Sequence, residues 1–167
     1  ENLFDDEIIP FVHVDKAAYV ENDNGPMKDQ SKARLAKLKP YFDRHNGSVT
    51  VGNACSITDG AAVVILAKES VAKKNKWQPM GYVSAYDYAG LEPHRMGLGP
   101  VYATAKLFSK HDITMADIDL IEINEAFAAQ VLANVRAFSS REFAKRCLNQ
   151  DHAVGAIDEE TLNCYGG

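Results

Sequence analysis

The sequence contains little cysteine, and its few cysteines are not arranged as a metal site or a disulfide framework. Cys55, Cys147 and Cys164 show no CxxC spacing and no nearby pair of histidines, so a zinc site and a disulfide scaffold are both disfavoured. Reduced thiols inside a cell are the simpler interpretation. Long apolar runs are also missing. The longest, residues 61–67, has the length of a strand and falls far short of the roughly 18 residues that suggest a membrane span.

An excess of positive charge is absent too. The 167 residues carry a formal net charge of −5, which argues against a general nucleic-acid binder because such affinity comes from clustered Lys and Arg. The hydrophobic content of 46% and charged content of 25% are ordinary for a globular protein. No secretory or transit segment is visible, but the first residue is not Met. We therefore expect the native start to lie upstream, where a targeting signal would be found.

The order of apolar patterns predicts strands alternating with helices. Pro100 stands at a plausible first turn, and Thr114 and Asp117 have capping-box spacing. Alternating elements indicate an α/β or mixed layered fold. The predicted strands are residues 8–14, 48–51, 61–67, 78–88 and 118–123, and the predicted helices are residues 31–39, 68–76, 101–111, 126–138 and 141–148.

Asn124 and Glu125 are placed where a predicted buried strand gives way to a helix. Polar groups at a buried position cost free energy unless they are paired. One interpretation is structural: Asn124 caps the helix and Glu125 lies in its first turn. The other is chemical, because backbone N–H groups at a helix N-terminus suit an anion or a developing oxyanion. These two residues alone leave both interpretations open, with the structural one favoured.

Two glycine-containing segments are further candidates for a ligand site. Residues 52–60 are rich in small and hydroxyl side chains and suit either close approach of a ligand or a tight turn capped by Asp59. Residues 96–100 lack the Lys-Ser/Thr pair of a phosphate loop, so a nucleotide site is disfavoured. His94 beside them is more typical of an exposed loop histidine than of a catalytic base. No cysteine has a positioned base by spacing.

Four segments taken together resemble one family. They are LAKLKPYF at 35–42, GNACSITDGAA at 52–62, MGLGPVYAT at 96–104 and NEAF at 124–127. In this order and separation they are similar to the thiolases, and residues 139–167 most resemble the β-subunits of fatty-acid oxidation complexes. The resemblance implies an α/β, layered α-β-α-β-α fold that is only partly represented. Residues 1–50 would be the end of the loop and CoA-binding region, and residues 51–167 the first part of the C-terminal domain.

The resemblance also implies roles for eight residues. Asn124 would hold a water in the oxyanion hole, and Glu125 would orient that site. Cys55 stands where a serine is common, and a thiol is a poorer hydrogen-bond donor; Met27 stands where a CoA-contacting arginine is often found. The positions that would contact CoA or line the acyl and pantetheine pocket are Phe42, Cys55, Ser56, Ile57, Met96 and Phe127.

The activity implied is CoA-dependent cleavage of a 3-ketoacyl-CoA to acetyl-CoA and a shortened acyl-CoA in fatty-acid β-oxidation. No metal or covalently bound cofactor is expected; CoA and acyl-CoA are substrates. The partners expected are a second copy, in a homodimer or homotetramer, and an α-subunit, and the location is the bacterial cytoplasm or the mitochondrion. None of the three cysteines matches the family's catalytic positions, so we expect the chain to be an internal piece of the enzyme. The alternatives are a non-catalytic CoA-ester binder and a biosynthetic acetoacetyl-CoA thiolase.

Overall fold

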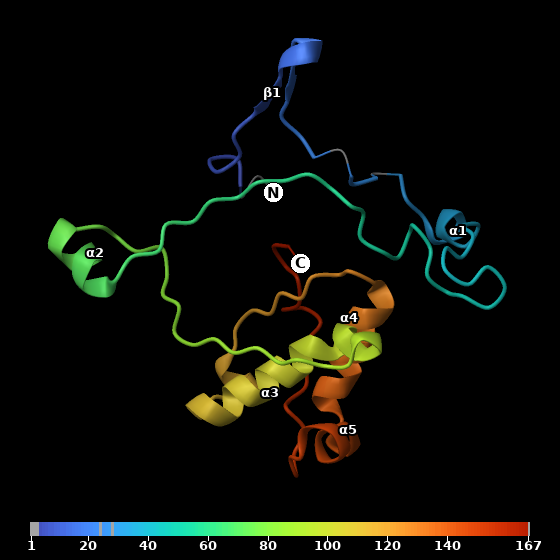
Figure 1. The fold of residues 1–167 in the computed structure, drawn as a ribbon, viewed down its shortest axis with the longest axis vertical. Helices are drawn as coiled ribbons and strands as arrows, with labels where there is room; N and C mark the ends of the chain where they lie inside the picture. The colour runs from blue at the N-terminus through green and yellow to red at the C-terminus, as the bar shows by residue number, and fades with distance from the viewer. Residues whose placement is uncertain (1–3, 24, 28, 167) are drawn as a thin grey trace. The chain divides into compact units, whose positions relative to one another are not determined.

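The computed structural model describes residues 4–23, 25–27 and 29–166, and the chain divides into two compact units, Glu1–Lys39 and Pro40–Gly167 (Figure 1). In the first unit, β1 (Phe11–His13) pairs antiparallel with β2 (Ala18–Val20) across a single 3₁₀ turn, η1 (Val14–Lys16). The predicted strand at residues 8–14 is thus confirmed in its second half.

The helix predicted at residues 31–39 is present but short. It is a single turn, α1 (Lys32–Leu35), and the side chain of Ser31 caps it by accepting the N–H of Arg34 at 3.2 Å. A helix this short has few internal hydrogen bonds to stabilise it, so the cap contributes much of its definition.

The second unit contains the longer helices. The helices α3, α4 and α5 lie together in Figure 1. None of the helices in the described part of the chain has both the length and the apolar character to cross a membrane. The helical elements in chain order are α2 (Glu69–Asn75), η2 (Pro93–Leu98), α3 (Gly99–His111), η3 (Met115–Asp117), α4 (Ala128–Ser139), α5 (Arg141–Phe143) and the π-helical turn η4 (Ala144–Leu148).

Local sequence signals explain where several of these helices begin and end. Pro100 stands in the first turn of α3, and Asp112 ends that helix in the left-handed conformation at φ 53°. The capping box is confirmed: Asp117 Oδ2 accepts the backbone N–H of Thr114 at 2.8 Å. Hydrogen bonds from Thr114 lower the pKa of the Asp117 carboxyl, because they stabilise its ionised form.

A small apolar core holds α3, α4 and the segment before α4 together. The ring of Tyr102 on α3 also packs edge-on against Phe143 on α5, with ring centroids 5.7 Å apart. One polar side chain, Asn134, is fully buried among these residues. The core residues are Val101, Ile123, Val131, Ala137, Phe138 and Ile157.

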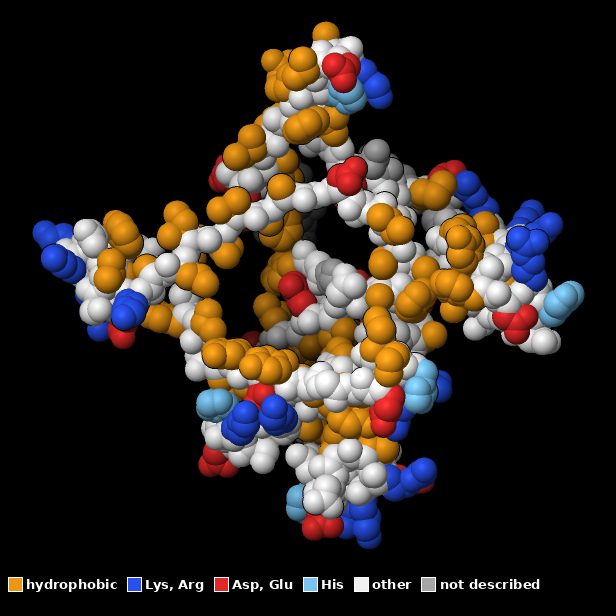
Figure 2. Space-filling view, in the orientation of Figure 1, with side chains coloured by type: hydrophobic (Ala, Val, Ile, Leu, Met, Phe, Trp, Pro, Cys, Tyr) orange, Lys and Arg blue, Asp and Glu red, His pale blue; other side chains and the backbone are white. Residues whose placement is uncertain are grey.

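Four predicted strands are wrong as ladder strands in the described residues. Residues 48–51, 61–67 and 78–88 form no strand, and residues 118–123 form only an isolated bridge at Ile121. A strand is defined by a hydrogen-bonded neighbour, and the apolar pattern does not supply one. Most hydrophobic side chains of residues 61–67 and 78–88 are exposed. Figure 2 shows hydrophobic groups along the extended stretches on both sides of α2, with 90% of Val63 and 89% of Ile65 accessible.

One buried carboxylate ties the extended stretch before η2 to α3. The side chain of Asp87 is 4% exposed, and its two oxygens lie 2.8 Å from Lys106 Nζ and 2.5 Å from Lys110 Nζ. The hydrogen bonds from these two ammonium groups hold the pKa of the Asp87 carboxyl well below its usual range. The two lysines are one helical turn apart, so they converge on a single partner.

We expect the stabilising effect of Asp87 to disappear in acid. In the unfolded chain the pKa of an aspartate is about 3.9, whereas the pKa of Asp87 in the folded protein is lower. The contribution of ionised Asp87 to the free energy of unfolding is therefore present above about pH 4. It is lost as the pH falls toward the folded pKa, because the unfolded state takes up the proton first. Urea unfolding of the wild type and Asp87→Asn should give a clear difference at pH 7 that shrinks at pH 3.

The matched control is Asp59→Asn, which changes an exposed aspartate that pairs with none of the described cations. A difference between wild type and Asp87→Asn that is equal at the two pH values would contradict the role of the two lysines.

Candidate active-site segment

Residues 121–128 contain both predicted catalytic residues and lead directly into α4. The second half of this stretch pairs with a neighbouring loop through an isolated antiparallel bridge. The N–H of Cys55 donates to the carbonyl of Ala126 at 3.0 Å, and the N–H of Ala128 donates to the carbonyl of Asn53 at 3.0 Å. The chain therefore stays extended until the first residue of the helix.

The first half of the stretch pairs with a segment from the C-terminal part of the chain. The N–H of Ile121 donates to the carbonyl of Thr161 at 3.1 Å, and the N–H of Asn163 donates to the carbonyl of Ile121 at 2.8 Å. The side chain of Asn163 continues this pairing. Its Oδ1 accepts the N–H of Ile123 at 2.8 Å, and its Nδ2 donates to the carbonyl of Ile123 at 2.9 Å.

The helix-cap interpretation of Asn124 and Glu125 is wrong. The N-cap position of α4 is Phe127, which is extended at φ −144° and ψ 138° and supplies no side-chain cap. Backbone pairing of residues 126 and 128 with the 53–55 loop delays the start of the helix past the predicted residue 126. Glu125 consequently lies before the first turn, and its Oε1 accepts a hydrogen bond from Asn163 Nδ2.

The expected burial of Asn124 and Glu125 is also wrong, since both residues are exposed. The side chain of Asn124 forms no hydrogen bond with any residue that the structure describes, whereas the preceding Ile123 is 7% exposed and belongs to the core. The exposed amide of Asn124 thus directly follows a buried residue whose backbone is hydrogen-bonded on both sides. This arrangement leaves both donor hydrogens and the acceptor oxygen of Asn124 available to a ligand.

Some of the predicted CoA-contact residues come together beside this segment. The rings of Phe42 and Phe127 lie edge to face with centroids 6.3 Å apart, and Cys55 is bonded through its backbone to the residue before Phe127. Ser56 and Ile57 follow Cys55 but are exposed, and Ile57 is fully accessible. The structure therefore places Phe42, Cys55 and Phe127 in one group and leaves Ser56 and Ile57 at its open edge.

Met96 belongs to η2, an element that packs against α4. It is 75% exposed, while its neighbour Gly97 is so close to α4 that an added Cβ would lie 2.9 Å from Gln130 Cγ. The buried amide of Asn134 fixes this approach. Its Nδ2 donates to the carbonyl of Gly97 at 2.7 Å, and its Oδ1 accepts the N–H of Val101 at 3.2 Å.

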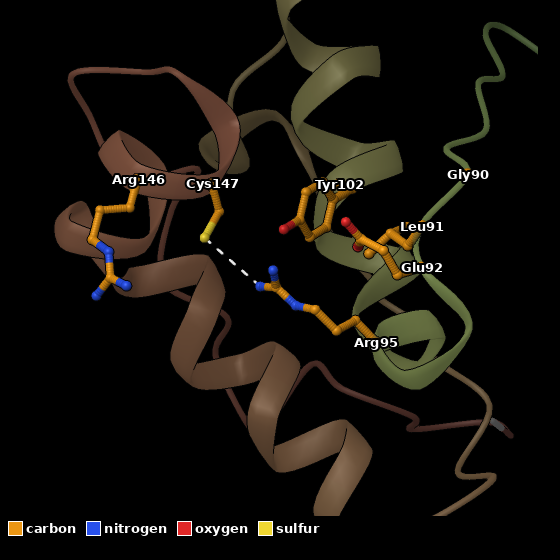
Figure 3. A pocket seen from close by; sticks show the side chains of 7 residues that line it. All are labelled: Gly90, Leu91, Glu92, Arg95, Tyr102, Arg146 and Cys147. Atoms are coloured by element: carbon orange, nitrogen blue, oxygen red, sulfur yellow. Dashed lines mark hydrogen bonds between the residues drawn. The ribbon is translucent and has the colours of Figure 1, made fainter.

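A cavity between η2, α3 and η4 contains none of the predicted site residues. Figure 3 shows Arg95 reaching from η2 toward Cys147 in η4, with Nη2 and Sγ 3.8 Å apart and Tyr102 facing the same space. The hydrogen bond to Cys147 raises the pKa of Arg95, and burial raises the pKa of the Tyr102 phenol. The cavity, of about 510 Å³, is lined by Gly90, Leu91, Glu92, Arg95, Tyr102, Arg146 and Cys147.

Two structurally important asparagines were missed by the sequence analysis. Asn134 falls on the apolar face of α4, so the helical period that identified Val131 and Phe138 could have marked it as a buried polar group in need of partners. Asn163 has a positive φ of 54°, and an asparagine three residues before the Gly166-Gly167 pair is a turn signal. Its partners, however, lie 40 residues earlier in the chain, and no local signal identifies them.

Two family models together match nearly the whole chain. The thiolase N-terminal domain model matches residues 1–70, and the thiolase C-terminal domain model matches residues 77–167. The chain belongs to the thiolase family. The resemblance found in the four sequence segments is thereby confirmed.

Known thiolases agree with this assignment in sequence and in structure. The chain is 39% identical over 168 aligned residues to the 3-ketoacyl-CoA thiolase of Aliivibrio fischeri (strain MJ11), covering 100% of this chain and 38% of that protein. It superposes on the Bacillus anthracis acetyl-CoA acetyltransferase with a TM-score of 0.81 and 38% identity, and on the dimeric peroxisomal thiolase of Saccharomyces cerevisiae with a TM-score of 0.81 and 33% identity. Each superposition covers 99% of this chain and 38% of the other.

These structures confirm the thiolase-like fold class. The chain spans about 38% of the length of the thiolases it matches. The roles assigned to the eight site residues and the domain boundary at residue 50 stay predictions.

We expect Asn134 to be a large contributor to the stability of the second unit. Asn134→Ala leaves the carbonyl of Gly97 and the N–H of Val101 without their partner, and an unsatisfied buried polar group costs about 1–3 kcal/mol. Urea unfolding should show a loss of that size. Leu132→Ala, on the exposed side of the same helix, is the control and should change the free energy of unfolding by about 0.5 kcal/mol or less. Equal effects of the two substitutions would refute the assignment.

Proposed function

We propose that the protein is an acetyl-CoA C-acyltransferase that cleaves 3-ketoacyl-CoA with CoA, as its similarity to the 3-ketoacyl-CoA thiolase of Aliivibrio fischeri suggests. In this reaction a cysteine thiolate attacks the 3-keto carbon, and the bond between C2 and C3 breaks. The acyl group stays on the cysteine as a thioester, while acetyl-CoA leaves as its enolate and is protonated. The thiol of CoA then takes the acyl group from the cysteine, giving the shortened acyl-CoA. None of the three cysteines of this chain is proposed as that nucleophile.

The observation that carries the proposal is the exposed amide of Asn124 on a rigid support. The enolate formed during cleavage places negative charge on the thioester oxygen, and preorganised donors aimed at that oxygen lower the barrier. Asn124 Nδ2–H would act there through a bound water, and the α4 N-terminus three residues later adds a favourable dipole. Glu125, bonded to Asn163, would hold the segment in the reactive orientation.

The aromatic group beside Asn124 is proposed to bind the CoA chain. Phe42 and Phe127 present ring faces and edges that suit the apolar parts of pantetheine, while Cys55, Ser56 and Ile57 form the edge of this surface. Met96 would complete the acyl side of the pocket. Flexible Met side chains fit irregular acyl chains. Met96 would therefore influence which acyl-chain lengths the enzyme prefers.

The metabolic setting is part of the proposal. Thiolytic cleavage of 3-ketoacyl-CoA completes a round of fatty-acid β-oxidation, in the cytoplasm of a bacterium or in a mitochondrion. The yeast relative is described as dimeric, which supports a homodimer or homotetramer here, and an α-subunit of an oxidation complex is a further proposed partner. Residues 1–50 would belong to the CoA-binding loop region and residues 51–167 to the C-terminal domain.

A biosynthetic role is the second candidate function, because the Bacillus anthracis structure, which is 38% identical to this chain, is named an acetyl-CoA acetyltransferase. The degradative and biosynthetic functions can be distinguished by the chain length of the preferred substrate. A β-oxidation enzyme should cleave medium- and long-chain 3-ketoacyl-CoA at least as well as acetoacetyl-CoA, whereas the biosynthetic enzyme should prefer the shortest substrate.

Replacement of Asn124 tests the proposed mechanism. In the enzyme that carries this chain, Asn124→Ala should lower kcat for thiolysis by about 10²–10³-fold, the usual cost of removing one oxyanion donor. The rate is measured as the CoA-dependent disappearance of 3-ketoacyl-CoA. Asn75→Ala is the control, since this amide bonds only to its own helix and should leave kcat unchanged. An Asn124→Ala enzyme with the wild-type rate would remove the basis of the proposal.

A further inference from the structure

The side chain of Asn163 replaces a stretch of backbone next to the predicted catalytic pair. Ordinary parallel pairing joins Ile121 to residues 161–163. At Asn163 the backbone turns away, with a positive φ of 54°, and the side-chain amide takes over the pairing of Ile123. It accepts from the N–H at 2.8 Å and donates to the carbonyl at 2.9 Å.

We propose that Asn163 is a positioning residue for Asn124 and Glu125 in thiolysis. The proposal rests on the proposed function, because it assigns Asn163 a role through those two residues. Asn163 fixes both peptide groups that flank the Cα of Ile123, and its Nδ2 also bonds the carboxylate of Glu125. Asn124 thus lies between Ile123, whose N–H and C=O both bond to Asn163, and Glu125, whose carboxylate bonds to the same side chain.

Backbone groups alternate in direction along this extended segment. This alternation explains why the side chain of Asn124 has no hydrogen-bond partner among the described residues. The backbone groups of residues 121 and 123 point to the edge occupied by residues 161–163, and those of residues 126 and 128 point to the edge occupied by residues 53–55. This is the two-residue period of an extended backbone. Both edges of the segment are therefore occupied, and the side chain of Asn124 is left without a partner among the described residues.

Asparagine suits this position for two physical reasons. Its amide offers an acceptor and two donor hydrogens on one short side chain, which matches the N–H and C=O of a peptide group together with one further acceptor. It also tolerates the left-handed backbone conformation better than most residues. Aspartate keeps the size and the acceptor but loses the donor, and glycine keeps the backbone conformation but loses the whole amide.

The test compares Asn163→Asp with wild type in the enzyme that carries this chain. In Asn163→Asp the carbonyl of Ile123 loses its donor and a second carboxylate faces Glu125. We expect kcat for thiolysis to fall by roughly tenfold or more, with KM for CoA within about twofold of wild type, since the CoA-contact residues lie on the other edge. Adding Glu125→Gln exchanges the two groups and should restore part of the lost kcat.

The control is Asn149→Asp. Asn149 has the same φ of 54° and is exposed, so its replacement should leave kcat and KM unchanged. Asn163→Gly keeps the positive φ accessible and serves as the second variant if Asn163→Asp does not fold; it too should lower kcat and spare KM. Thermal unfolding of every variant separates loss of folding from loss of rate.

Three outcomes decide the matter. A fall in kcat with an unchanged KM and a partial recovery in the Asn163→Asp, Glu125→Gln double variant supports the proposal. An unchanged kcat in folded Asn163→Asp and Asn163→Gly, while Asn124→Ala is slow, overturns the role of Asn163 and leaves the proposed function standing. A wild-type rate in Asn124→Ala overturns the proposed function whatever Asn163 does.

Discussion

The position of the predicted catalytic amide depends on one constraint: peptide groups that are partly buried need hydrogen-bond partners. Residues 121–128 satisfy this demand without a continuous sheet in the described part of the chain, by using a different loop on each edge. The loop at residues 53–55 brings Cys55 beside Phe127. The segment at residues 161–163 brings an amide against Glu125. The pairing that satisfies the backbone therefore also brings the candidate site residues together.

Asparagine side chains recur as substitutes for backbone in this unit. Asn53 spans its own loop, accepting from Thr50 and donating to Ser48. Asn134 links α4 to the start of α3, and Asn163 extends the pairing of Ile123. An amide carries a donor and an acceptor like the peptide group itself, so it can connect segments whose backbones diverge. Such a scaffold is specific, because a residue with only a donor or only an acceptor leaves a partner unsatisfied.

Features decided by neighbours along the chain were predicted well from the sequence. The helix α3 with Pro100 in its first turn and the capping box at Thr114 follow from contacts within one or two turns. Features decided by distant partners were not. The run at residues 61–67 has the composition of a strand but no ladder partner among the described residues, and Asn124 would have capped a helix had the 53–55 loop not held residues 126–128 extended. The family resemblance pointed to the candidate site segment, while the proposed role of Asn163 depends on contacts that only the structure shows.

Ile123 takes part in both kinds of interaction that position the candidate site, apolar packing and hydrogen bonding. Its side chain packs in the core with Val101 and Phe138, and burial of such a side chain contributes about 1.5–3 kcal/mol. Apolar packing has little directionality, so it can set the depth of the chain but not the orientation of the next peptide. The two hydrogen bonds from Asn163 supply that orientation. Since an oxyanion donor acts only when it is already aimed, an amide at residue 124 needs both the packed side chain and the bonded backbone of the residue before it.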